Sequence, residues 1–121
     1  MTMTLLKPRY NRGDVVLVLF PNSDLRTAKA RPAVVVQADH LQTGLPQLIV
    51  AMITSKLARA PHPCRVLIRR TTRMGKQSGL LTDSVVMTDN LATISETAID
   101  RSIGTVVMKT IDAALRHTLN L

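Results

Sequence analysis

The sequence predicts a mainly β protein with one C-terminal helix, arranged as a small, partly open barrel. Its apolar runs are short, and turn-forming residues separate them closely, which is typical of strands. The two longest, Val15–Phe20 and Leu48–Ile53, have six residues each, far fewer than the ~18 that span a bilayer. No helix-length segment separates the early strands, so parallel β-α-β units are disfavoured. A length of 121 residues fits a single domain over residues 1–121.

Each expected element follows from local pattern. Strands are expected over five apolar or alternating segments: Val15–Phe20, Ala33–Gln37, Leu48–Thr54, Arg65–Arg69 and Asp83–Thr88. The segments Pro21–Pro32 and Arg70–Gly79 are predicted to be basic loops, because the first begins with three turn formers after its proline and the second holds two glycines. Ser95 can cap a short helix over Ser95–Arg101. Apolar residues near helical spacing in Val106–Leu119 predict an amphipathic C-terminal helix.

Charge is distributed unevenly along the chain. Sixteen Lys and Arg against eight Asp and Glu give a net charge of +8, and residues 1–76 hold 13 basic but only 3 acidic side chains. Eleven of the sixteen are arginine, whose planar fork suits phosphate, so we expect a polyanionic partner, with nucleic acid ahead of a membrane surface. The alternative is a basic surface that only maintains solubility. Tyr10 and Phe20 are the only aromatic residues, so the chain cannot stack bases on an aromatic platform.

Several kinds of chemistry find no support in the sequence. His40, His62, His117 and Cys64 lack metal-ligand spacing, and no glycine-rich nucleotide motif occurs, so we expect neither metal nor cofactor. No GxSxG motif occurs either, although a Ser-His-Asp triad set by geometry alone stays open. A single cysteine cannot form an internal disulfide, and Met1–Tyr10 lacks the pattern of a secretory signal, which together predict a cytoplasmic location.

A polar constellation is predicted at strand ends. Arg31 precedes Pro32, which biases its backbone toward an extended conformation, and Thr54 and Ser55 close the third strand. A guanidinium and two hydroxyls near one end of a barrel could hold a phosphodiester. The alternative for Arg31 is a solvated charge at the edge of a loop.

In order and spacing, the chain resembles the MazF/PemK endoribonuclease toxins of type II toxin–antitoxin systems. The resemblance covers about residues 12–119, and its individual blocks are short. The blocks are Arg12–Val16, Arg31–Val36, Ile49–Ser55, Gly79–Val86, Asp89–Ile94 and Ile103–Gly104.

This resemblance implies an SH3-like barrel that forms a homodimer, cleaves single-stranded RNA without a metal, and is neutralised by an antitoxin. It also implies that Arg31 and Thr54 lie at the phosphate whose bond is cleaved. A positioned guanidinium offers paired donors to the charge that builds on phosphate oxygens, and a threonine hydroxyl can donate to the same oxygens. We expect further RNA contacts from six residues: Arg26, Lys29, Ser55, Lys56, Asp89 and Asn90.

The chain departs from the family pattern at two positions. Asn90 keeps an amide, but Ala92 stands where the family has an arginine, and Met87 stands where one branch pairs an arginine with the aspartate at position 89. These departures bear on rate and substrate choice. The alternative function is a non-catalytic toxin on the same barrel that binds a protein such as gyrase, because the related gyrase-inhibitor toxins use this architecture for protein binding and a fold does not fix a function.

Overall fold

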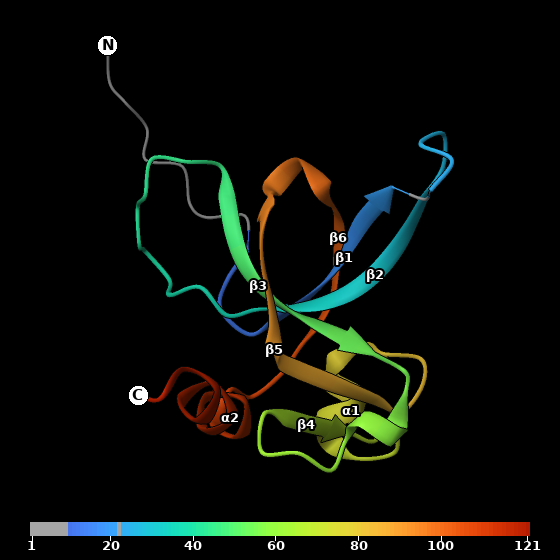
Figure 1. Ribbon diagram of the computed structural model, residues 1–121, viewed down its shortest axis with the longest axis vertical. Helices are drawn as coiled ribbons and strands as arrows, with labels where there is room; N and C mark the ends of the chain where they lie inside the picture. The colour runs from blue at the N-terminus through green and yellow to red at the C-terminus, as the bar shows by residue number, and fades with distance from the viewer. Residues whose placement is uncertain (1–9, 22) are drawn as a thin grey trace.

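The computed structural model describes residues 10–21 and 23–121 (Figure 1). Most of Met1–Tyr10, the segment expected to lack a secretory signal, lies outside these residues, and so does Asn22 of the predicted loop Pro21–Pro32. The elements follow in the order β1 (Asp14–Pro21), β2 (Ala28–Val35), β3 (Gln47–Thr54), the 3-10 turn η1 (Leu57–Arg59), β4 (Arg65–Ile68), α1 (Arg73–Ser78), β5 (Ser84–Ser95), the 3-10 turn η2 (Glu96–Ala98), β6 (Ile99–Thr105) and α2 (Lys109–Leu119).

The strands form one antiparallel sheet of six strands in the order β4-β5-β3-β2-β1-β6. The sheet curls strongly without closing, and α2 lies at the end of the molecule where α1 and β4 also lie (Figure 1). This arrangement confirms the predicted partly open, mainly β architecture with a C-terminal helix. Neither helix of the described chain has the length and apolar character needed to cross a membrane.

Both faces of the central strands are buried, which explains their continuous apolar runs. One face, here called the Val16 face, packs a first core cluster, and the opposite face, here called the Val15 face, packs a second. Ile111 and Leu115 of α2 and Leu80 after α1 cover the Val15 face. On β1, β2 and β3, the members of the Val16 face are Val16, Val18, Ala33, Val35, Leu48, Val50 and Met52; those of the Val15 face are Val15, Val34, Ala51 and Ile53.

The second strand begins earlier than predicted. β2 starts at Ala28 and ends at Val35, so Arg31 and Pro32 lie inside a strand and the preceding loop is shorter than Pro21–Pro32. The reason is that β1 is long enough to pair with β2 from Pro21↔Ala28 onward. Pro32 lies one residue beyond the last β2–β3 pair, where its missing N–H ends the ladder.

The predicted loop Arg70–Gly79 contains a helix. Thr72 caps α1 by accepting the Gly75 N–H at 3.1 Å, and Gly79 ends it with a φ of +74°. Glycines that suggested a loop are needed here for close packing. A Cβ on Gly75 would lie 2.0 Å from the Arg69 carbonyl oxygen, and one on Gly79 would lie 2.0 Å from that of Ile103.

The predicted helix over Ser95–Arg101 is wrong. The strand predicted at Asp83–Thr88 is the longer β5, which runs to Ser95; the Ser95 hydroxyl accepts the Thr97 N–H, but only one 3-10 turn follows before β6. β6 is an edge strand with exposed polar residues, so it lacks the apolar alternation that marks a strand. The C-terminal helix is confirmed but starts at Lys109; Val106 instead lies beside the start of β1, where its N–H donates to the Gly13 carbonyl.

Candidate active site

The site predicted around Arg31 and Thr54 lies where β2 and β3 separate. The last paired residues of these strands are Ala33 and Met52. Arg31 precedes Ala33 by two residues and Thr54 follows Met52 by two, so they occupy opposing positions just past the end of the ladder. Because alternate residues of a strand share a face, both lie on the Val16 face. Figure 1 shows the two strands diverging beyond this point.

A cavity of about 560 Å³ opens between the separated strands, where Val15-face residues such as Ile53 and Leu80 meet Arg31 and Thr54 of the Val16 face. Its apolar lining comes from Leu17, Pro32, Ile53, Leu80, Leu81 and Ile103. Four cationic side chains also line it, and no carboxylate does among the described residues: Lys29, Arg31, Lys56 and Arg101. The site is therefore suited to an anion next to an uncharged group.

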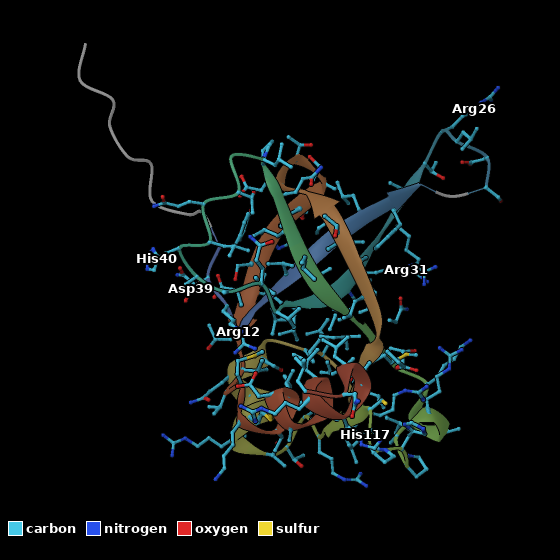
Figure 2. The ribbon with its side chains drawn as sticks, turned by 60° about the vertical axis from the view of Figure 1, so that its left-hand side comes forward. Arg12, Arg26, Arg31, Asp39, His40 and His117 are labelled. Atoms are coloured by element: carbon cyan, nitrogen blue, oxygen red, sulfur yellow. The ribbon has the colours of Figure 1, made fainter. Side chains whose placement is uncertain are left out.

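Arg31 and Thr54 both have hydrogen-bond donors available. Arg31 is exposed, and no hydrogen bond or ion pair engages its guanidinium within the described part of the chain. Figure 2 shows its side chain extending from the sheet toward solvent. The Thr54 hydroxyl oxygen accepts the Lys56 N–H at 3.2 Å, which leaves its own O–H free to donate. Ser55 and Lys56 follow directly and also line the cavity.

Of the two basic residues predicted near the β1–β2 hairpin, Lys29 lines the cavity and Arg26 does not. Arg26 lies on the connection between the strands, well away from Arg31 (Figure 2). The turn there is held by Asp24, whose carboxylate accepts the backbone N–H groups of Arg26 and Thr27 at 2.9 and 3.1 Å. These two hydrogen bonds lower the pKa of Asp24.

Asp89 and Asn90 lie on a bulge of β5 outside the cavity. Met52 pairs with Met87, but the next residue of β3, Ala51, pairs with Leu91, so three residues of β5 have no partner on β3. Such bulges redirect side chains away from the regular ladder, and both residues are exposed.

Arg65 binds Asp89 with two hydrogen bonds, which sequence reasoning did not predict. Its Nε donates to Oδ1 at 2.8 Å and its Nη2 to Oδ2 at 2.6 Å. This contact lowers the pKa of Asp89 and raises that of Arg65. The alternation in Arg65–Arg69 correctly indicated a strand, but no sequence signal connected it to Asp89, 24 residues away.

The histidines and the cysteine do not come together in one site. His62 Nδ1 accepts the Cys64 N–H at 3.0 Å, and Cys64 is buried. His40 and His117 lie apart on the surface (Figure 2). Within residues 10–21 and 23–121, no three His, Cys, Asp or Glu side chains gather where they could hold a metal ion.

Comparison with known proteins decides the family. The profile of the PemK-like, MazF-like toxins of type II toxin–antitoxin systems matches residues 11–119. Endoribonuclease MazF2 of Mycobacterium bovis and endoribonuclease MazF6 of Mycobacterium tuberculosis are each 35% identical over 107 residues, which is 85% of this chain and 90% of the relative. The chain belongs to the PemK-like, MazF-like toxin family. This confirms the resemblance, and the names of these relatives support the predicted enzyme class.

Solved structures of MazF toxins have the same fold as this MazF-like toxin. The Mycobacterium tuberculosis toxin MazF-mt6 aligns with a TM-score of 0.69 at 22% identity, covering 89% of this chain and 97% of that one. A mycobacterial endoribonuclease in complex with its cognate antitoxin aligns at 0.68 and 21% identity, covering 93% and 96%. A MazE–MazF structure from Deinococcus radiodurans aligns at 0.69 and 15%, covering 93% and 96%.

Proposed function

We propose that this MazF-like toxin is a sequence-selective, metal-independent endoribonuclease that cleaves single-stranded RNA, mRNA above all, and so inhibits translation and growth. Family membership and the endoribonuclease names of its relatives support the enzyme class. The observation that carries the proposal is that Arg31 and Thr54, each with a free donor, line the same cationic cavity. A non-catalytic toxin that binds a protein such as gyrase would have no need of this arrangement.

The proposed reaction is an internal transesterification. The ribose 2′-oxygen attacks the adjacent phosphorus and loses its proton, while the bond from phosphorus to the 5′-oxygen breaks and that oxygen gains a proton. The products are a 2′,3′-cyclic phosphate and a 5′-hydroxyl, and no metal-bound water is needed. Negative charge builds on the equatorial oxygens, where the Arg31 guanidinium and the Thr54 hydroxyl donate hydrogen bonds. Arginine stays protonated at neutral pH and is a poor general base, so Arg31 acts by stabilising charge.

The remaining RNA contacts divide by position. Lys29, Ser55 and Lys56 line the cavity and bind the phosphates next to the cleaved bond. Arg26, on the hairpin loop, contacts RNA farther along the strand. Asp89 and Asn90, on the bulge of β5, contact bases. Each phosphate contact that is removed should flatten the salt dependence of binding.

The proposed partners are a second copy of the chain and an acidic antitoxin, with action in the cytoplasm where mRNA lies. Exposed leucines beside α2 support a homodimer: Leu41, Leu119 and Leu121 line one apolar groove there. The basic excess of residues 1–76 favours an acidic, extended antitoxin segment that blocks phosphate access. Such a segment should compete with RNA and associate more slowly as salt is added. Simultaneous binding without mutual weakening would contradict this groove-blocking arrangement.

The test of the proposed reaction uses two RNA substrates in EDTA. One is all-ribose, and the other carries a single 2′-deoxyribose at the cleaved position. We expect only the first to be cut, with cyclic phosphate and 5′-hydroxyl ends. Cleavage of the 2′-deoxy substrate, or loss of all activity on chelation, would contradict the proposed chemistry.

A further inference from the structure

A row of directly paired residues runs across the sheet to β4 from positions two residues away from Arg31 and Thr54. Directly opposed residues of an antiparallel pair share a face of the sheet. Arg65, at the end of this row, therefore lies on the Val16 face with Arg31 and Thr54. β4 and β3 are two strand spacings apart, about 10 Å, which is within reach of a nucleotide that flanks the cleaved phosphate. The row is Ala33, Met52, Met87 and Arg65.

Arg65 holds the Asp89 carboxylate in a fixed orientation. Its Nε and Nη2 each donate to one carboxylate oxygen, and its Nη1 donates to the Arg59 carbonyl at 3.0 Å. The Arg65 side chain is 18% exposed, whereas that of Asp89 is 35% exposed. The guanidinium is thus enclosed behind a carboxylate whose outer side is open. The two hydrogen bonds also hold Asp89 ionised at neutral pH.

An ionised carboxylate restricts what part of an RNA it can bind. It only accepts hydrogen bonds, and each Asp89 oxygen keeps a lone pair beyond the one that Arg65 uses. It repels phosphate, so the groups of a flanking nucleotide that suit it are hydrogen-bond donors, namely the ribose 2′-hydroxyl and the N–H groups of the base. Only the base N–H groups differ from one nucleotide to another, so only they can give sequence selectivity. A carboxylate that accepts from an exocyclic amino group is an established means of base discrimination.

We propose that Arg65 is a positioning residue of the RNA site, which holds Asp89 to accept a hydrogen bond from the exocyclic amino group of a base flanking the cleaved phosphate. This inference rests on the proposed ribonuclease function and adds the chemistry of its base selectivity. Arg65 touches neither the base nor the phosphate, and it acts through Asp89.

Met87 offers a way to move the guanidinium without removing it. Met87 lies directly across from Arg65 and two residues before Asp89 on β5. An arginine at position 87 would therefore start next to both the vacated position and the carboxylate. The double variant Arg65→Met/Met87→Arg keeps the composition of the pair and only exchanges its strands.

The experiment measures kcat/KM on a short RNA that carries the cleaved sequence mapped with the wild-type toxin. Each flanking base is replaced in turn by an analogue without its exocyclic amino group: inosine for guanosine, purine riboside for adenosine, and a pyrimidin-2-one riboside for cytidine. One replacement should lower the wild-type kcat/KM by about tenfold or more. Arg65→Met should lose a similar factor on the natural RNA and become indifferent to that replacement. The exchanged double variant should regain the discrimination.

Controls separate this role from a merely structural one. Arg73→Met removes an exposed arginine of α1 that does not line the cavity, and it should leave the discrimination unchanged. If Arg65→Met does not fold, the proposal is tested with the double variant and with Arg65→Lys, and a folded double variant that does not discriminate between the natural base and its analogue overturns it. The proposal is also overturned if Arg65→Met discriminates like the wild type, or if Arg65→Met loses only antitoxin binding. If the folded wild type cuts no RNA at all, the proposed function itself fails, which is a different result.

Discussion

Replacing Arg31 by alanine should nearly abolish RNA cleavage while leaving the fold intact. The side chain is exposed and has no partner among the described residues, so its removal should change the free energy of unfolding by no more than about 0.5 kcal/mol. Loss of one preorganised donor to a transition-state oxygen typically lowers the rate by about 10²–10³, or roughly 2.7–4 kcal/mol. The effect on cleavage should therefore exceed the effect on stability several-fold.

Thr54→Ala should act on the same step. Both side chains line the cavity that opens past the last β2–β3 pair, so both are expected to donate to oxygens of one phosphate. Residues that act on the same atoms are not additive, and the double variant should be less impaired than the product of the single effects.

The assay is single-turnover cleavage of a labelled RNA under saturating enzyme, with a melting curve for every variant. Lys109→Ala is the matched control, because Lys109 is an exposed cation on α2 that does not line the cavity. The reasoning is refuted if Arg31→Ala cleaves at the wild-type rate with an unchanged melting curve. It is also refuted if Lys109→Ala is as impaired as Arg31→Ala.

Three further predictions concern RNA binding, packing and pH. Arg26→Ala should weaken RNA binding and reduce the slope of log K against log salt by about 0.7, measured by fluorescence anisotropy; an unchanged slope would exclude Arg26 as a phosphate contact. Gly79→Ala should lower Tm by more than Gly44→Ala, because the two glycines have φ values of +74° and +78° but only Gly79 would place a Cβ against another backbone oxygen; equal shifts in calorimetry would contradict this. The Arg65 hydrogen bonds lower the pKa of Asp89, so the stabilisation they give the folded state is present above the unfolded pKa of about 3.9 and is lost as pH falls through the folded pKa. The difference in Tm between the wild type and Asp89→Asn should therefore shrink on acidification, and a difference that grows would contradict this.

The sequence predicted those elements in which burial determines residue type. β1 and β3 are buried on both faces and therefore read as apolar runs, and both lie where they were expected. β6 was not predicted because it is an edge strand paired on one side only, and its exposed residues, such as Arg101 and Ser102, do not show the apolar pattern of a buried strand. α1 escaped notice because its glycines satisfy a packing requirement that only the folded chain displays.

The candidate site divides in the same way. Arg31 and Thr54 could be singled out as residues at strand ends, but their opposition depends on the β2–β3 register, which the sequence alone did not supply. The partnership of Arg65 with Asp89 depends on a bulge of three residues, and nothing in the local pattern of β5 marks it. The local sequence pattern thus indicated where single site residues lie on their strands, whereas their contacts with residues of other strands depend on the strand register.

Pro32 explains why the cavity opens beside Arg31. The Val36 N–H donates to Ile49 of β3, and alternate residues of a strand direct their N–H groups to the same neighbour, so the nitrogens of Val34 and Pro32 also face β3. Proline has no N–H, and the β2–β3 ladder stops there. The side toward β1 is unaffected, because residues 31 and 33 make those bonds, and β2 continues as a strand. The Arg-Pro doublet thus supplies both a cation and the break that opens the cavity beside it.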